Sequence, residues 1–128
     1  PDSIEFSTLG GWIATKASGM KRNKYGNIED IVQRVCVVSS GGLMWQQKTA
    51  GQSAFSRVST GTDLCSLMMG SEGSFGVITS AVLKIWPVAD RKEFESAIFF
   101  SFDAGLQFVR DVAKMGNLKP ASVRLLDN

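Results

Sequence analysis

Apolar and polar positions along the first half of the chain alternate in ways that predict several short elements. Ile4 to Leu9 is a short extended run, and the amphipathic stretch Trp12 to Ser18 predicts a short helix that Gly19 ends. A turn is expected over residues 27–30. The β-branched run Arg34 to Ser39, a glycine-containing turn and the run from Leu43 to Gln47 predict a hairpin.

After this hairpin, residues 48–59 are polar and predict a loop. Thr60 or Thr62 is expected to cap a short helix, whose apolar spacing runs to Met68 and which Gly70 ends. A glycine-rich turn leads to the β-branched run Gly76 to Trp86, which predicts a strand ended by proline.

Charges cluster over residues 88–95, and this change in composition marks a candidate domain boundary. A strand from Ser96 to Phe102, a helix capped by Asp103 and a strand from Ala121 to Leu126 are predicted beyond it. Strand, helix and strand within about 30 residues form one βαβ unit or half of a larger layer. We therefore expect an α+β fold in two parts, residues 1–89 and residues 90–128.

Composition limits the function classes only in part. The chain has 128 residues, 44% of them apolar, and a net charge of +2 with both signs interspersed, which disfavours a nucleic-acid binder. Four cations lie between Lys16 and Lys24, either as a solvated loop, which composition favours, or as an attraction for a phosphorylated ligand. No apolar run has the length of a membrane span.

Cys36 and Cys65 each lie in an apolar segment, so buried free thiols are expected rather than a disulfide or a metal site. The sequence has no histidine, which excludes His-based zinc sites and Ser-His-Asp triads from this chain. Because the chain begins at Pro1 without an initiator methionine, we expect a piece of a longer protein.

The run MGSEGSFGVIT places Gly70, Gly73 and Gly76 three residues apart. Their spacing is not G-x-G-x-x-G, a helix precedes them and a strand follows, and no P-loop pattern is present. Residue types alone favour a tight helix-to-strand connection over a ligand loop. A carboxylate beside two glycines, as at Glu72, could also accept hydrogen bonds from a ligand hydroxyl.

The runs PDSIEFSTLGGWIATKASGMKRNKYGNIEDIV, RVSTGTDL and MGSEGSFGVITSAVLKIWP resemble the alkylglycerone-phosphate synthase family. These are FAD enzymes of ether-lipid synthesis, of the vanillyl-alcohol-oxidase type. The SEG element is also shared with D-lactate dehydrogenases and glycolate oxidases, so it indicates the flavin fold rather than the reaction. The region around ASGMK and YGNIED is more particular to the synthases.

The resemblance implies that residues 1–89 are the C-terminal part of an FAD-binding domain of the PCMH type and that residues 90–128 begin a cap domain. Hydroxyl groups and the N–H groups near Gly10 and Gly11 would suit a pyrophosphate, and bare backbone at Gly73 and Gly76 would admit the cofactor. The implied FAD contacts form three stretches: Asp2, Ser3, Ile4, Glu5, Phe6, Ser7 and Thr8; Thr15, Lys16, Ala17 and Ser18; and Glu72, Gly73, Ser74, Phe75, Gly76, Val77 and Ile78.

Two of these residues depart mildly from the family, because Phe75 stands for a usual leucine and Lys16 for a frequent arginine. Arg57 aligns with a family arginine near the active centre and is the expected substrate-positioning residue, with an exposed loop arginine as the equal alternative. Tyr25, the single tyrosine, is expected to be structural. No catalytic residue and no metal ligand is expected in this chain, since the family's catalytic tyrosine and histidine-rich loop lie beyond it.

The reaction implied by the resemblance exchanges the acyl chain of acylglycerone phosphate for a long-chain fatty alcohol, with FAD as an electrophilic anchor. The family also implies a peroxisomal homodimer with peripheral membrane association, and no nucleic-acid partner. Two alternatives stay open. One is an FAD-dependent oxidoreductase of 2-hydroxy acids, and the other is a non-catalytic α/β module without a cofactor.

Overall fold

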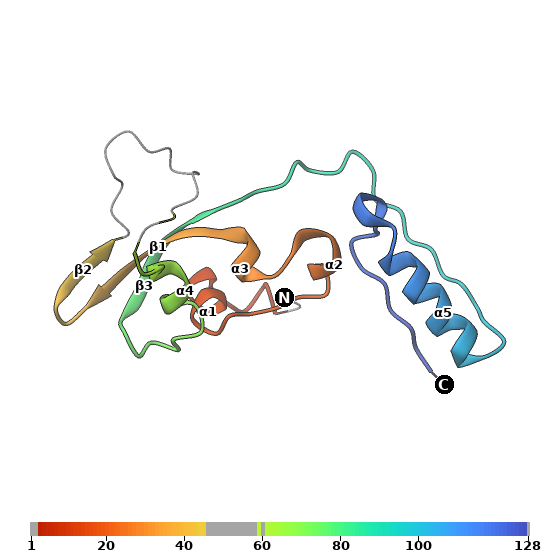
Figure 1. Ribbon diagram of the computed structural model, residues 1–128, viewed down its shortest axis with the longest axis horizontal. Helices are drawn as coiled ribbons and strands as arrows, with labels where there is room; N and C mark the ends of the chain where they lie inside the picture. Colours follow the sequence, from red (N-terminus) through yellow and green to blue (C-terminus); the bar gives the residue numbers. More distant parts are fainter. Residues whose placement is uncertain (1–2, 46–58, 60, 128) are drawn as a thin grey trace.

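A computed structural model of the protein describes residues 3–45, 59 and 61–127, and its element order is given in Figure 1. The fold is α+β, with a small sheet and short helices in the first part and one longer helix in the second. The elements are α1 (Leu9–Ala14), α2 (Arg22–Tyr25), α3 (Ile28–Ile31), β1 (Val32–Ser39), β2 (Gly42–Trp45), α4 (Leu64–Met68), β3 (Val77–Leu83), α5 (Phe102–Ala113) and the 3₁₀ turn η1 (Gly116–Leu118).

The sheet has the order β2-β1-β3, and both neighbours run antiparallel to β1. The predicted hairpin is confirmed as β1 and β2, with Ser39 opposite Gly42. The predicted strand before the proline is confirmed as β3, but it ends at Leu83, and residues 84–86 leave the sheet before Pro87. β1 is bulged between Val32 and Arg34, and an extra residue reverses the alternation of faces. Val32, at an even position, therefore reaches the same core as Val35 and Val37.

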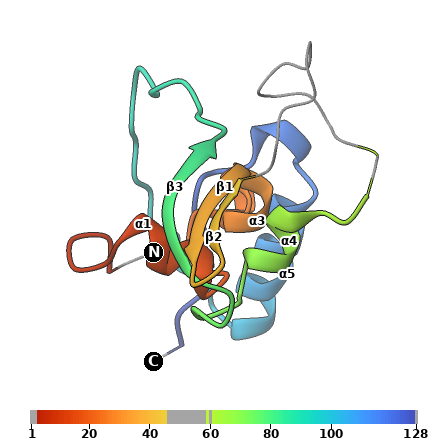
Figure 2. The same ribbon diagram turned by 90° about the vertical axis from the view of Figure 1, so that its left-hand side faces the viewer.

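The hydrophobic core lies between this sheet and the short helices (Figure 2). Ile13 of α1 and Val37 of β1 are fully buried, and α1 packs against β3 while α4 packs against β1. α4 contributes Cys65 and Met68 to the same cluster. The helices are too short to be stable alone, so burial of these side chains is what holds them.

Three of the short elements differ from their predictions. The first helix begins at Leu9, because the side chain of Thr8 caps it, and it ends at Ala14 rather than near Ser18. Residues 28–31 form the helical turn α3 rather than a simple turn. α4 is capped by Asp63, whose carboxylate accepts from the Cys65 backbone N–H at 3.0 Å, and not by a threonine.

The predicted helix beyond residue 100 is confirmed as α5, but its cap is Ser101 rather than Asp103. The predicted strands on either side of it, Ser96 to Phe102 and Ala121 to Leu126, are not strands in the structure. Both segments run beside α5 (Figure 1) without pairing with any strand of the described part. A strand requires a neighbour for its backbone N–H and C=O groups, and sequence alone does not supply one.

Cys36 and Cys65 are free and buried, which confirms that prediction. Burial raises the pKa of the Cys65 thiol to about 11, and the nearby Asp63 carboxylate adds to this shift by disfavouring the thiolate. The Cys65 thiol is therefore structural rather than nucleophilic. Within the described ranges, every helix is too short or too polar to cross a membrane.

Candidate functional site

The first predicted FAD stretch is residues 2–8, and its described part, from Ser3 onward, is hydrogen-bonded to the start of α1. Ser7 Oγ accepts from the indole Nε1 of Trp12 at 2.6 Å and donates to the Ser3 carbonyl at 2.7 Å. Thr8 Oγ1 accepts from the Gly11 N–H at 3.1 Å. These bonds explain why the chain turns into α1 at this point, and they fix the stretch against the helix.

The second stretch, residues 15–18, forms the end of the same helix. The Lys16 N–H donates to the Ile13 carbonyl at 3.1 Å, and the Ala17 N–H donates to the Trp12 carbonyl at 2.8 Å. This pair of bonds is a Schellman motif, which places its C′ residue in the left-handed region. Lys16 has φ 51°, so a lysine occupies a position that glycine usually takes.

The third stretch, residues 72–78, opens with a tight turn. The Ser74 N–H donates to the Ser71 carbonyl at 2.9 Å, and both central residues have positive φ, 49° at Glu72 and 85° at Gly73. Positive φ at both central positions is the pattern of a type I′ turn. Glu72 and Lys16 are the two non-glycine residues with positive φ in the described part of the chain, and backbone strain of this kind concentrates at functional sites.

Backbone hydrogen bonds join the glycine-rich turn to the end of α1, next to the second stretch. The Gly70 N–H donates to the Ile13 carbonyl at 3.1 Å, and the Glu72 N–H donates to the Ala14 carbonyl at 2.9 Å. A Cβ placed on Gly70 would lie 3.5 Å from the Cβ of Lys16. The glycine-rich turn therefore satisfies carbonyls at the end of α1, and the strained residues lie on adjoining loops.

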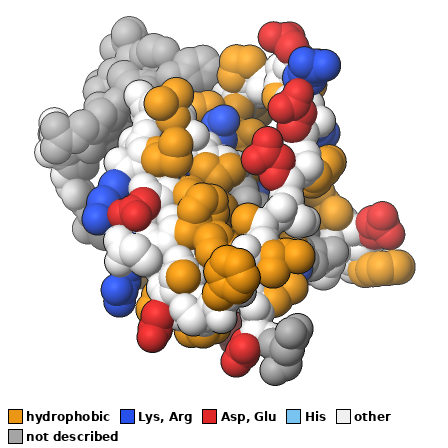
Figure 3. Space-filling view, turned by 90° about the vertical axis from the view of Figure 1, so that its right-hand side faces the viewer, with side chains coloured by type: hydrophobic (Ala, Val, Ile, Leu, Met, Phe, Trp, Pro, Cys, Tyr) orange, Lys and Arg blue, Asp and Glu red, His pale blue; other side chains and the backbone are white. Residues whose placement is uncertain are grey.

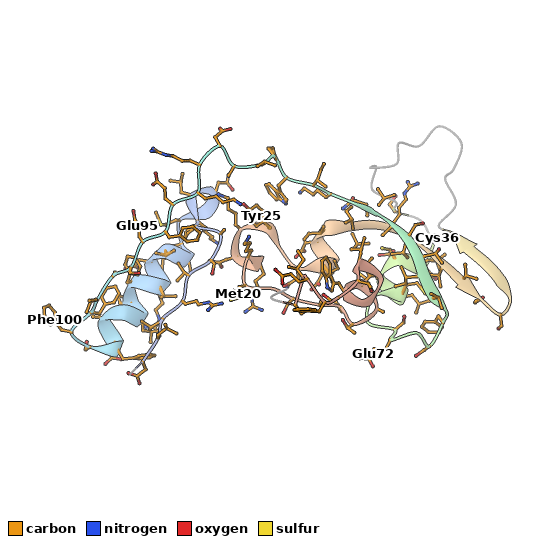
Figure 4. All side chains as sticks on the ribbon, turned by 180° about the vertical axis from the view of Figure 1, so that it is seen from behind. Met20, Tyr25, Cys36, Glu72, Glu95 and Phe100 are labelled. Atoms are coloured by element: carbon orange, nitrogen blue, oxygen red, sulfur yellow. The ribbon has the colours of Figure 1, made fainter. Side chains whose placement is uncertain are left out.

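The third stretch also approaches the N-terminal end of α1, where the first stretch is hydrogen-bonded. A Cβ added to Gly10 would lie 3.2 Å from the Ile78 carbonyl oxygen of β3. The structure thus gathers all three stretches around one six-residue helix. Figure 4 places Glu72 on the loop that precedes β3. Sequence reasoning missed the linking roles of Trp12 and Gly70, because their bonds to Ser7 and to the Ile13 carbonyl follow only from the folded arrangement.

The two glycines expected to admit the cofactor differ in their surroundings. Gly73 has φ +85°, and a Cβ added there would meet nothing within 4 Å. A Cβ on Gly76 would lie 2.4 Å from the Val38 carbonyl oxygen and 2.9 Å from Val37 Cγ1. Gly76 is therefore already required by the contact between β1 and β3, whereas Gly73 borders open space.

Several of the hydrogens expected for a pyrophosphate are already used inside the protein. The hydroxyls of Ser7, Thr15 and Ser74 donate to backbone carbonyls at 2.7, 2.9 and 2.6 Å, and the Gly11 N–H is taken by Thr8. A hydroxyl has one hydrogen, so these groups keep only acceptor capacity. By contrast, the N–H groups of Gly73 and Phe75 donate to no backbone carbonyl within the described ranges.

The exposed surface of the three stretches suits a planar cofactor with a charged end. Phe6 is 92% exposed, Val77 69% and Phe75 45%, so the first and third stretches both present apolar side chains to solvent. Lys16 is exposed and supplies a positive charge on the second stretch. Apolar contacts, backbone donors and one cation are what an FAD ring and its phosphates require, so the residues present fit the cofactor.

Beside the second stretch lies an open hollow of about 430 Å³, lined by Ser18, Gly19, Met20 and Arg22. The basic run of the sequence therefore borders the candidate site. Asp2 and Arg57 lie outside the described residues, so their predicted roles in FAD binding and substrate positioning stay predictions.

Replacing Lys16 with glycine should stabilise the full-length protein. A non-glycine residue in the left-handed region costs about 1 kcal/mol or more, and glycine removes this cost at the expense of greater unfolded-state entropy, for a net gain of about 0.5 kcal/mol. Urea denaturation of the cofactor-free protein measures the change. Lys16→Ala is the matched control, since it removes the cation but keeps the strain. A glycine variant no more stable than the alanine variant would contradict the assignment of strain.

Comparison with known proteins identifies a related group. Residues 1–46 match the FAD binding domain family. The whole chain is 47% identical to an alkyldihydroxyacetonephosphate synthase of Caenorhabditis elegans, of which it covers 20%. It is also 34% identical over 127 residues to the glycolate oxidase subunit GlcD of Bacillus subtilis, covering 99% of this chain and 26% of that protein.

A solved structure of alkyldihydroxyacetonephosphate synthase superposes on 71% of this chain and 15% of its own, with a TM-score of 0.59 and 38% sequence identity. The chain spans about a fifth of the length of the curated synthases that it matches.

Proposed function

We propose that the chain belongs to the FAD-binding flavoproteins that include the alkyldihydroxyacetonephosphate synthases and that it forms part of the flavin site of such a synthase. The proposed reaction replaces the acyl chain of acylglycerone phosphate with a long-chain fatty alcohol. Sequence identity of 47% over the whole chain supports the synthase, against 34% to the glycolate oxidase subunit.

The observation that carries the proposal is the pair of bonds from Gly70 and Glu72 to the end of α1. These bonds hold the glycine-rich turn against the end of α1, so that Glu72 of the third stretch lies close to the second stretch, and each of these stretches contains a charged residue with positive φ. Such pre-arranged backbone costs free energy and is retained where a ligand uses it.

FAD, when bound, supplies the electrophilic ring system of the reaction. The chain's own residues position it. The Glu72 carboxylate is an acceptor for hydroxyl groups, and the N–H groups of Gly73 and Phe75, which donate to no backbone carbonyl of the described residues, are donors for the polar edge of the ring. Lys16 contributes a cation for phosphate, as a point charge rather than a bidentate fork. Phe6, Phe75 and Val77 exclude water beside the ring.

We further propose that residues 90–128 begin the substrate-side domain. Phe99 and Leu125 both approach α5 at Gly105, where an added Cβ would lie 3.3 and 2.5 Å from their side chains. Ala121, Val123 and Leu125 are half-buried while Ser122, Arg124 and Leu126 are exposed, the alternation of a strand. Apolar side chains gather on this end of the molecule (Figure 3), with Ile98 at 99% and Leu126 at 81% exposure.

These observations support two strands of a sheet whose other strands come from the rest of the polypeptide. A sheet of this kind would cover the apolar side chains that now face solvent. The same proposal includes peroxisomal residence, a homodimer, peripheral membrane association and a positioning role for Arg57, and the family resemblance is what supports them.

The test uses the full-length protein. Purified protein should carry FAD, seen as flavin absorption in the visible range, and should convert acylglycerone phosphate and a radiolabelled fatty alcohol into alkylglycerone phosphate. Protein without flavin that also shows no thermal shift with FAD would support a non-catalytic module instead. Bleaching of the bound flavin by a 2-hydroxy acid under anaerobic conditions, without alkyl exchange, would favour the oxidoreductase that the GlcD similarity suggests.

A further inference from the structure

An aromatic contact links the loop after the second flavin stretch to the segment that leaves β3. The rings of Tyr25 and Trp86 lie with centroids 5.6 Å apart at an interplanar angle of 68°, an edge-to-face arrangement. Lys84 Nζ lies 5.0 Å from the centroid of the Trp86 ring, within the range of a cation–π contact. Three side chains from two distant segments therefore form one cluster.

The loop that Tyr25 belongs to has little else to hold it. Residues 20–24 are all exposed, and α2 within it is a single turn whose backbone bonds are local. The loop closes at its base through the Ile28 N–H and the Ala17 carbonyl, at a long 3.4 Å. Within the described ranges, Tyr25 provides the loop's one aromatic contact to another segment.

The loop carries three basic side chains, so its position decides where their positive charge lies relative to the flavin site. Lys21, Arg22 and Lys24 follow directly after the second flavin stretch, and Arg22 lines the open hollow beside Ser18. Figure 4 shows Met20 and Tyr25 on this loop, with Glu72 on the loop before β3. A loop held at Tyr25 keeps these cations close to the site, whereas a free loop would spread them over many conformations.

We propose that Trp86 is a positioning residue for the flavin site: through Tyr25 it holds the basic loop, residues 18–26, against the second flavin stretch. The inference rests on the proposed function, since FAD is the ligand whose phosphates the basic loop would face. The proposed role of Trp86 is indirect and requires no contact with the cofactor. Lys84 stabilises the ring's orientation from the side of β3.

The experiment measures FAD affinity of the full-length apoprotein from the quenching of flavin fluorescence. Trp86→Ala and Tyr25→Ala should each weaken binding about 3- to 10-fold, the range of one aromatic pair. The double variant should be no weaker than either single variant, because both remove the same contact. Trp86→Phe and Tyr25→Phe keep an aromatic ring and should retain most of the wild-type affinity for FAD.

Phe94→Ala is the matched control, since Phe94 is an aromatic side chain of the same connecting segment with 94% exposure and should leave affinity unchanged. Hydrogen exchange of residues 19–26 in the apoprotein should accelerate in Trp86→Ala and Tyr25→Ala but not in Phe94→Ala. Wild-type protein that binds no FAD overturns the proposed function and this inference with it. Wild-type protein that binds FAD, with alanine variants of equal affinity or loop exchange, overturns the inference alone.

Discussion

Replacing Gly76 with alanine is expected to destabilise the protein by about 3 kcal/mol or more, enough to abolish a marginally stable fold. The added Cβ would lie 2.4 Å from the Val38 carbonyl oxygen and 2.9 Å from Val37 Cγ1. Neither atom can withdraw easily, since one is backbone and the other belongs to a fully buried side chain. The φ of +142° adds strain for any residue with a Cβ.

The free energy of unfolding of the full-length protein, from urea denaturation, measures this effect. Gly42→Ala is the matched control, because Gly42 has φ +111° at the other edge of β1 and an added Cβ there meets nothing within 4 Å. It should lose only about 1 kcal/mol, from backbone strain alone. Equal losses in the two variants would show that the approach of β3 to β1 at Gly76 is not as close as described.

Replacing Gly73 with valine is expected to give folded protein with little or no FAD, an affinity loss of about 100-fold or more, equivalent to about 3 kcal/mol. The Cβ and its methyl groups would project from the turn into open space beside the exposed Phe75. A β-branched residue also disfavours φ +85°, so the turn would change shape and move the Gly73 and Phe75 N–H groups.

Flavin content after purification and the dissociation constant of added FAD measure this effect. Gly116→Val serves as the control for backbone strain, because Gly116 has φ +56°, an open Cβ position and no place in the three stretches. It should lose similar stability and keep its FAD. Normal flavin occupancy in Gly73→Val would remove the glycine-rich turn from the site.

Local sequence signals predicted much of the first part of the fold. The β-branched run of β1, the glycine-containing turn to β2 and the β-branched run of β3 are all local features, so composition was sufficient to predict them. The ends of the helices were predicted less well. Asp63 caps α4 where Thr60 or Thr62 was expected, and Ser101 caps α5 where Asp103 was expected, because several adjacent residues could cap and only folded geometry selects one.

The candidate site followed a different rule. Family resemblance named the three stretches, but their gathering around α1 depends on long-range bonds such as the one from Glu72 to Ala14. The sequence also gave no sign that Lys16 and Glu72 would take left-handed conformations, since glycine is the residue that predicts them. The two segments flanking α5 were predicted as strands but are not strands in the described part of the chain. A strand forms only with a neighbouring segment, and the sequence of one segment does not identify that neighbour.

The hydrogen bonds from Gly70 and Glu72 to the carbonyls of Ile13 and Ala14 affect how the glycine-rich turn and α1 can move. Lifting the glycine-rich turn away would remove one of the two backbone donors of the Ile13 carbonyl and the Glu72 donor of the Ala14 carbonyl. Opening of the loop and fraying of the helix are therefore coupled rather than independent fluctuations. A ligand that holds either loop would slow the breathing of both.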